Sequence, residues 1–107
     1  MICRLWRGWT TRENADAYER VVRGEVIPGI EARRIPGFQS IDLIRRDRED
    51  DVEFVTLMWF DALASVRAFM GEDYELAHVP AAARAVLSGF DERSAHFEVL
   101  DRRRQPD

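Results

Sequence analysis

The sequence predicts an α+β domain in which strands and helices follow the order β-α-β-β-α-β. Four short segments rich in aliphatic and aromatic residues indicate strands. Two amphipathic stretches separate the first strand from the second and the third from the fourth. This order is that of the ferredoxin-like split βαβ fold, in which one four-stranded antiparallel sheet carries both helices on one face.

The first strand and the start of the first helix can be placed from their apolar patterns. Residues 2–10 are rich in aromatic and aliphatic side chains and alternate imperfectly, which favours a strand. A helix follows from Ala15, because Tyr18, Val22 and Val26 recur at four-residue steps while charged residues fill the opposite face.

The end of this helix contains residues that disturb helical geometry. Pro28 and Gly29 fall inside the helical stretch, so we expect a kink or a restart before residues 30–34. The Ile-Pro-Gly run at 35–37 then ends the helix.

The middle of the chain predicts a β-hairpin followed by a helix. Residues 38–46 and 52–60 are strand-like, and the charged run at 48–51 connects them. We expect Asp61 to cap the next helix and Gly71 to end it.

The last third of the chain predicts one more helical piece and the final strand. Pro80 suits the first turn of a helix over residues 81–88, and residues 94–100 supply the fourth strand. Residues 1–101 therefore form one domain, and 102–107 form a charged tail.

The third strand predicts a sheet that is covered on both faces. Its apolar residues occupy both parities, with Phe54, Met58 and Phe60 on one side. The other side carries Val55, Leu57 and Trp59. Because both helices lie on one face, we expect a second copy of the chain to cover the other, giving a homodimer.

Composition limits the classes of function. The net charge is −4, and the acidic residues and the 16 basic residues, all arginine, are mixed along the chain, so we expect no nucleic-acid partner. No apolar run approaches the ~20 residues of a membrane-spanning helix. Cys3 is the single cysteine and cannot form an internal disulfide. Because no secretory leader is apparent, we expect a cytoplasmic protein without a membrane partner.

The chain lacks the sharp catalytic motifs. It has no glycine-rich phosphate loop, no nucleophile elbow and no paired cysteines or histidines with metal-ligand spacing. A metal site built from His78, His96 and Glu98 is conceivable from ligand type, but the spacing carries no signature, so we expect none.

One residue and three short segments carry a resemblance to a known family. They are Trp6, the run Trp59-Phe60-Asp61 at the end of the third strand, Leu76-Ala77-His78 after the second helix, and Ser94-Ala95-His96-Phe97-Glu98-Val99 at the end. Through these residues the chain resembles the antibiotic biosynthesis monooxygenases, and the resemblance extends from Ile2 to Leu100. That resemblance implies a dimeric α+β barrel.

The resemblance implies two kinds of chemistry. In the haem-degrading branch of the family, an asparagine on the first strand, a tryptophan ending the third and a histidine after the second helix surround the iron. Trp59 and His78 match two of these positions, but Trp6 occupies that of the asparagine. A bulky indole there should shrink the cleft and remove a polar group, so haem stays the lesser alternative.

The cofactor-free branch oxidises phenolic or anthrone-like substrates with molecular oxygen, and this activity is our leading expectation. It requires a base, an aromatic pocket and groups that stabilise a substrate anion. The candidate base is His78 or His96, and Arg4 or Arg7 would steady the anion. The remaining candidates would form the pocket walls: Trp6, Trp59, Phe69 and Tyr74.

Several of these residues also have a purely structural interpretation. Trp59 on a doubly buried strand can be a core residue, and His96 can line the dimer interior or face water. Glu98 shares the parity of His96 and would raise its pKa. A third functional class therefore stays open, a non-catalytic dimeric domain that binds a small ligand.

Overall fold

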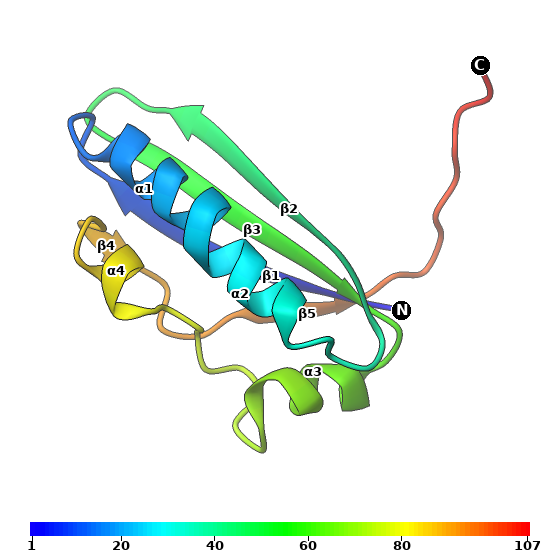
Figure 1. The fold of residues 1–107 in the computed structure, drawn as a ribbon. Coiled ribbons are helices and arrows are strands. Elements are labelled where there is room, and N and C mark those ends of the chain that lie inside the picture. Colours follow the sequence, from blue (N-terminus) through cyan, green and yellow to red (C-terminus); the bar gives the residue numbers. More distant parts are fainter.

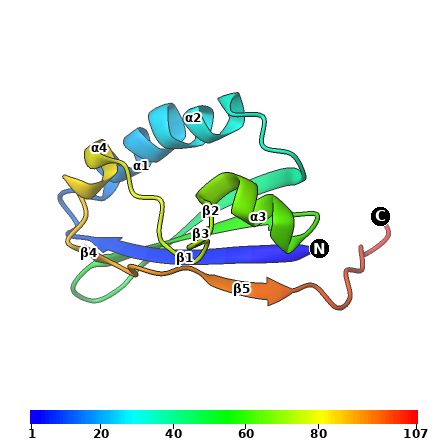
Figure 2. The same cartoon turned by 90° about the horizontal axis from the view of Figure 1, so that it is seen from below.

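The computed structural model describes all 107 residues and places every helix on one face of a single antiparallel sheet (Figures 1 and 2). The elements in chain order are β1 (Ile2–Thr10), α1 (Ala15–Val21), η1 (Val22–Val26), α2 (Ile27–Ala32), β2 (Phe38–Asp47), β3 (Val52–Phe60), α3 (Leu63–Met70), α4 (Ala81–Arg84), β4 (Gly89–Phe90) and β5 (Ala95–Glu98). The residues that follow β5 have no regular structure and extend away from the sheet (Figure 1).

The sheet has the strand order β2-β3-β1-β4, and β5 also pairs with β1. β4 pairs with Gly8 and Trp9 of β1, whereas β5 pairs with the stretch from Ile2 to Leu5. The two short strands thus share one edge of β1 and together fill the fourth position of the ferredoxin-like sheet. The predicted α+β fold is confirmed, but the expected single strand over 94–100 is shorter and is preceded by β4, which the sequence analysis missed.

The hairpin of β2 and β3 forms where it was predicted, and β3 has the predicted bounds. The interpretation of Asp61 as a helix cap is wrong. The N-cap of α3 is Ala62, without a side-chain bond, and the Asp61 carboxylate instead accepts a hydrogen bond from the amide of Gln39. Gly71, at φ +88°, ends α3 as predicted, because this backbone conformation favours glycine.

Strand parity divides the sheet into a covered face and an open face. Phe54 and Phe60 of β3 are fully buried beneath the helices. Leu57 and Trp59, which point the other way, are only half-buried. Figure 2 shows no helix on that second face. The apolar residues on both sides of β3 are therefore present as predicted, but within one chain only one side is covered.

Two apolar clusters join the helices to the sheet. Tyr18 and Val22 pack with Phe54 in the first cluster, and the rings of Tyr18 and Phe54 lie 4.7 Å apart. Ile30 of α2 packs in the second cluster, with Phe60 and its neighbours. α1, η1 and α2 follow one another without a gap and form one continuous helical rod, which thus contributes to both clusters.

That rod contains a π-helical turn, η1, between α1 and α2, in which the N–H of Ile27 bonds to the carbonyl of Val22, five residues earlier. A regular α-helix turns about 100° per residue, which would place Tyr18 and Ile30 about 120° apart around the axis. The wider π-turn absorbs one residue, which reduces this angle to about 20°. Because Tyr18 and Ile30 are both almost fully buried, the π-turn aligns the two halves of the rod on one apolar face.

Pro28 gives a physical reason for the π-turn. In a regular helix its ring would clash with the carbonyl of Gly24, four residues earlier, and it has no N–H to donate. The irregularity that we expected at Pro28 and Gly29 therefore lies just before them, and the helix continues through Pro28 without a break.

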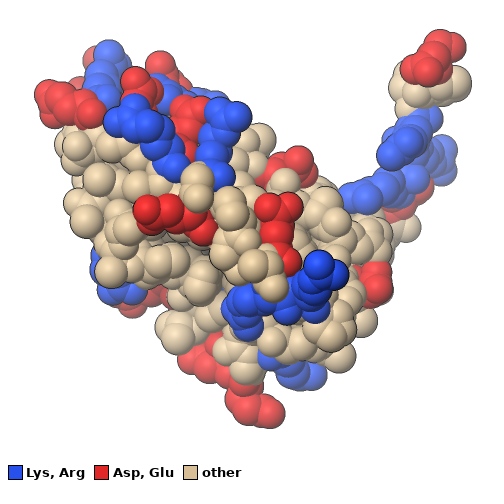
Figure 3. Space-filling view, viewed as in Figure 1, with Lys and Arg blue, Asp and Glu red and all other residues tan.

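Charged side chains of both signs mix on the helical face (Figure 3). Arg45 of β2 pairs with Asp16 and Glu19 of α1, which joins the edge strand to the first helix. No helix of the chain combines the length and the apolar character needed to span a membrane.

Deletion of Gly24 should convert the π-turn to a regular helix with Pro28 in its interior. We expect the free energy of unfolding to fall by about 3 kcal/mol, the usual cost of an interior helical proline. Adding Pro28→Ala to the deletion should restore most of it. Urea unfolding measures both variants.

The control is Gly24→Ala, since a Cβ at this position would meet nothing within 4 Å. It should leave stability unchanged or raise it by up to about 1 kcal/mol. A deletion variant as stable as the natural chain without Pro28→Ala would show that Pro28 and the π-turn are not coupled.

Candidate functional site

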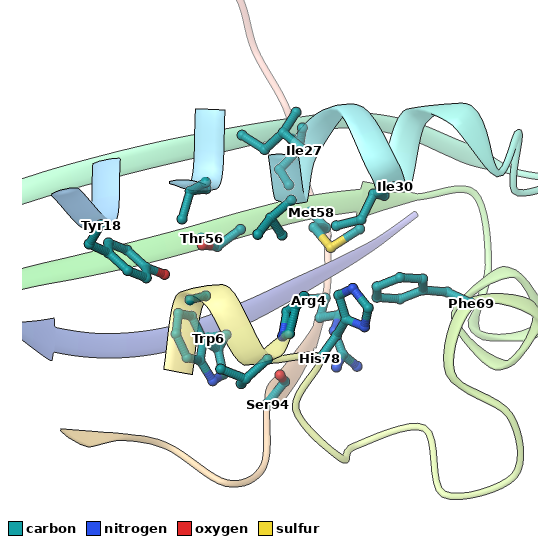
Figure 4. Close-up of a pocket in the computed structure, with 16 residues that line it drawn as sticks. Arg4, Trp6, Tyr18, Ile27, Ile30, Thr56, Met58, Phe69, His78 and Ser94 are labelled. Atoms are coloured by element: carbon teal, nitrogen blue, oxygen red, sulfur yellow. The ribbon is translucent and has the colours of Figure 1, made fainter. Parts of the chain in front are cut away.

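A pocket lies between the helical rod and the covered face of the sheet (Figure 4). Its cavity volume is about 50 Å³, and 11 of the 16 residues around it are hydrophobic. It opens to solvent. A cavity of about 150 Å³ holds benzene, so this pocket is narrow and must widen around a ring.

The rod supplies one wall and the sheet the other. Tyr18, Val22, Val26, Ile27 and Ile30 line the pocket from α1, η1 and α2. In a regular helix Tyr18 and Ile27 would lie about 180° apart. They line one pocket because the π-turn rotates Ile27 towards it. The floor is formed by side chains of β1, β2 and β3, namely Arg4, Trp6, Ile41, Thr56 and Met58.

Trp6 lines the pocket without filling it. Its indole N–H donates a hydrogen bond to the carbonyl of Asp91, 2.8 Å away. A Cβ on Gly8 would come within 2.6 Å of this indole. Glycine at that position therefore lets the Trp6 ring lie along β1 over Gly8, away from Arg4.

Arg4 is the most buried charged residue of the site, with 3% of its surface exposed. Its guanidinium donates to the carbonyl oxygens of Tyr74 and Leu76, the latter at 2.8 Å. It also lies 5.4 Å from the centre of the Phe69 ring. Burial lowers the pKa of Arg4 to about 10, which leaves it charged at neutral pH.

Arg4 also determines the state of His96. Arg4 Nη1 lies 3.0 Å from His96 Nε2. Because a guanidinium has no acceptor, Nε2 must accept this bond and the ring proton must sit on Nδ1, which is buried without a partner. The pKa of His96 is lowered, first by burial and then by the charge of Arg4. The expectation that Glu98 raises this pKa is therefore wrong.

His78 lines the pocket on the loop before α4 and is exposed to solvent on its outer side. Its ring meets that of Phe69 edge-on at 5.3 Å. Partial burial lowers its pKa, and the charges of Arg33 and Arg4 add to this. His78 is thus neutral near pH 7 and has a nitrogen that can accept a proton.

The structure brings together some of the predicted site residues and separates others. Arg4, Trp6, Phe69 and His78 line the pocket. Tyr74 and His96 stand directly behind Arg4, with their rings 5.1 Å apart.

Trp59 and Arg7 lie outside the pocket, because strand parity turns both to the open face of the sheet. The indole N–H of Trp59 donates to Asp42, and Arg102 lies over its ring. Arg7 pairs with Asp91. Neither Trp59 nor Arg7 therefore lines this pocket, contrary to the expected grouping of the site residues.

Sequence reasoning missed Ser94 and the rod residues. Ser94 lines the pocket, is 4% exposed, and its hydroxyl has no hydrogen-bond partner. Its position just before the last strand gave no signal, because a single serine has no spacing. No three His, Cys, Asp or Glu side chains gather closely enough to hold a metal ion.

The two lowered histidine pKa values predict a loss of stability in acid. When a group has a lower pKa in the folded state than in the unfolded chain, the unfolded chain binds the proton more readily. The free energy of unfolding therefore decreases once the pH falls below the pKa of the unfolded chain. The free energy of unfolding should therefore be highest above pH 6.5, the usual histidine value, and fall as the pH drops through the folded pKa values.

Urea unfolding between pH 5 and 8 measures this slope. His96→Gln, which keeps an acceptor for Arg4, should make the slope shallower. Carboxylates contribute at the acid end, so the comparison is between the variant and the natural chain. An unchanged slope would contradict a lowered pKa for His96.

Comparison with known proteins gives matches in structure. No protein-family model matches the chain, and no curated protein matches it in sequence. A Bacillus cereus protein assigned as an antibiotic biosynthesis monooxygenase superposes with a TM-score of 0.69 at 12% identity, covering 99% of this chain and 97% of its own.

Two further solved structures share the arrangement. One, from Chloroflexus aurantiacus and assigned in the same way, has a TM-score of 0.55 at 15% identity and 95% coverage of both chains. SnoaB from Streptomyces nogalater, described as a cofactor-independent oxygenase, has a TM-score of 0.51 at 21% identity, with 99% of this chain and 98% of its own covered. The chain therefore has the fold of the antibiotic biosynthesis monooxygenases.

Proposed function

We propose that this protein is a cofactor-independent monooxygenase that oxidises a small phenolic molecule with molecular oxygen. The observation that carries the proposal is a neutral histidine, His78, beside a buried cation, Arg4, in a mainly apolar pocket. The likeness to SnoaB, described as a cofactor-independent oxygenase, supports the same reaction class.

In this proposal His78 accepts the proton of the substrate hydroxyl, and Arg4 stabilises the oxyanion that forms. The electron-rich anion then reduces oxygen, and the substrate supplies all the electrons. A phenol and one O₂ give a quinone and one water, so one oxygen atom enters the product and the other leaves as water. No external reductant is needed.

His78 is a better base than His96 in this pocket. His96 uses Nε2 to accept from Arg4, its other nitrogen carries the ring proton, and the residue does not line the cavity. His78 borders the cavity directly. We therefore assign proton transfer to His78 and the positioning of Arg4 to His96.

The narrow cavity favours a single-ring phenol over a three-ring anthrone as the substrate. It also argues against haem, the alternative that the matches at Trp59 and His78 suggest. Trp59 lies on the open face of the sheet, and a porphyrin is far larger than the space beside His78. The residues present do not fit haem in this conformation.

We also propose that two copies of the chain pair through the open face of the sheet, as homodimers with isologous interfaces do. Phe97 is 53% exposed there, and the half-buried Leu5, Leu57 and Trp59 extend the same apolar surface. A cytoplasmic location stays a prediction.

His78→Ala should reduce kcat/KM for oxygen uptake with phenolic substrates by about 10²- to 10⁴-fold, the usual contribution of a general base. His96→Gln keeps an acceptor for Arg4 and should lower kcat/KM less than about tenfold, because His96 is not the general base in this proposal. Oxygen-electrode assays over a phenol series measure both. Equal losses would remove the distinction between the two histidines, and oxygen uptake intact in His78→Ala would rule out His78 as the base.

Leu57→Glu places a charge at the centre of the open face and should separate the copies. Light scattering should give twice the 12.5 kDa chain mass for the natural protein and the single mass for this variant. Arg20→Glu, on the exposed side of α1, is the matched control and should remain dimeric. A natural chain that is monomeric at micromolar concentration would contradict the proposal.

A further inference from the structure

Arg4 is a buried cation for which the chain supplies no anion. The ion pairs of the molecule involve other arginines, and Arg4 takes part in none of them. Its acceptors are two backbone carbonyls and a histidine nitrogen, all neutral. A buried charge without a counter-charge is costly, which points to an anion from outside the chain.

The guanidinium has donors left for such an anion. It carries five N–H groups, and the three hydrogen bonds to Tyr74, Leu76 and His96 use three of them. Arg4 also borders the cavity. Planar guanidinium groups with free N–H pairs bind carboxylates through two parallel bonds.

Ser94 provides a second, independent observation. Its hydroxyl is buried, has no partner, and belongs to the lining of the same cavity. A buried hydroxyl without a partner is costly and uncommon. Figure 4 shows Ser94 at the end of the pocket where Arg4 and His78 lie.

The surroundings reinforce the positive character of this end. Arg33 lies over the ring of Phe69 at 5.0 Å, and Arg4 lies over the same ring at 5.4 Å. No acidic side chain lines the cavity. The opposite wall is apolar and is formed by Val22, Ile27 and their neighbours.

We propose that the pocket binds a small organic acid, with its carboxylate held by Arg4 and Ser94 and its apolar part against the helical rod. This deepens the proposed function and rests on it in one respect, since the substrate would then be a phenolic carboxylic acid. Its carboxylate would take the free N–H groups of Arg4, and the guanidinium would stabilise the nearby phenolate through its charge alone. Binding of the acid itself requires no oxidation.

The test compares acids with amides of nearly the same shape. Benzoate and benzamide form one pair, and isobutyrate and isobutyramide form a smaller pair that suits the narrow cavity. We expect each acid to bind the full-length protein at least tenfold more tightly than its amide, as measured by calorimetry at pH 7 and low salt. Amides that bind as tightly as the acids, or no binding of either acid, would overturn the proposal.

Three variants locate the binding. Ser94→Ala should weaken acid binding about tenfold, the lower end for a hydrogen bond to a charged group, and leave amide binding nearly unchanged. Arg4→Gln should abolish the preference for acids. Arg7→Gln, three residues along β1 but on the open face, is the control and should bind as the natural chain does. Acid binding that survives Ser94→Ala and Arg4→Gln alike would place the acid elsewhere.

If Arg4→Gln does not fold, Ser94→Ala and the acid–amide comparison still decide the matter. Failure of the proposed function has a different signature. Acids would bind with the expected preference, but phenolic acids would cause no oxygen uptake, and the protein would then be a non-catalytic acid-binding domain.

Discussion

The burial of the Arg4 guanidinium is the constraint on which the site depends. Its bonds to the carbonyls of Tyr74 and Leu76 hold the segment after α3 against β1, and that segment leads directly to His78. Its contact with His96 joins β1 to β5 through side chains as well as through the sheet. This one charge thus positions the loop and sets the tautomer of one histidine, and it adds to the effect of burial, which is the main cause of the lowered pKa of both.

The helical rod supplies the apolar counterpart to this polar end. The π-turn allows Tyr18, Ile27 and Ile30 to face the sheet together, although regular helical spacing would spread them around the axis. Pro28 favours this irregular turn, since it removes a donor that a regular helix would need. The same feature therefore completes the core and shapes the pocket wall. Pro28, which in the sequence suggests a helix break, is instead accommodated by a π-helical turn.

The fold was predictable because its signals are local and repeated. The aliphatic and aromatic runs of β1 and β3 and the four-residue apolar spacing from Tyr18 each identify an element with little help from the rest of the chain. The site was predictable only in part. Arg4 and His78 carry chemistry in their residue type, but the unpartnered hydroxyl of Ser94 arises from contacts between distant segments. The parity of Trp59 was readable from β3 alone, but which of the two faces the helices and the pocket occupy is decided by tertiary packing.

Nitrogen-detected NMR of the two imidazole rings across pH 4.5 to 8 tests the central role of Arg4 most directly. We expect both histidines to titrate below 6.5, and neutral His96 to carry its proton on Nδ1 because Nε2 accepts from Arg4. If His96 titrates at or above 6.5, or carries its proton on Nε2, it does not accept a hydrogen bond from a buried Arg4 guanidinium. The buried guanidinium would then not organise this site.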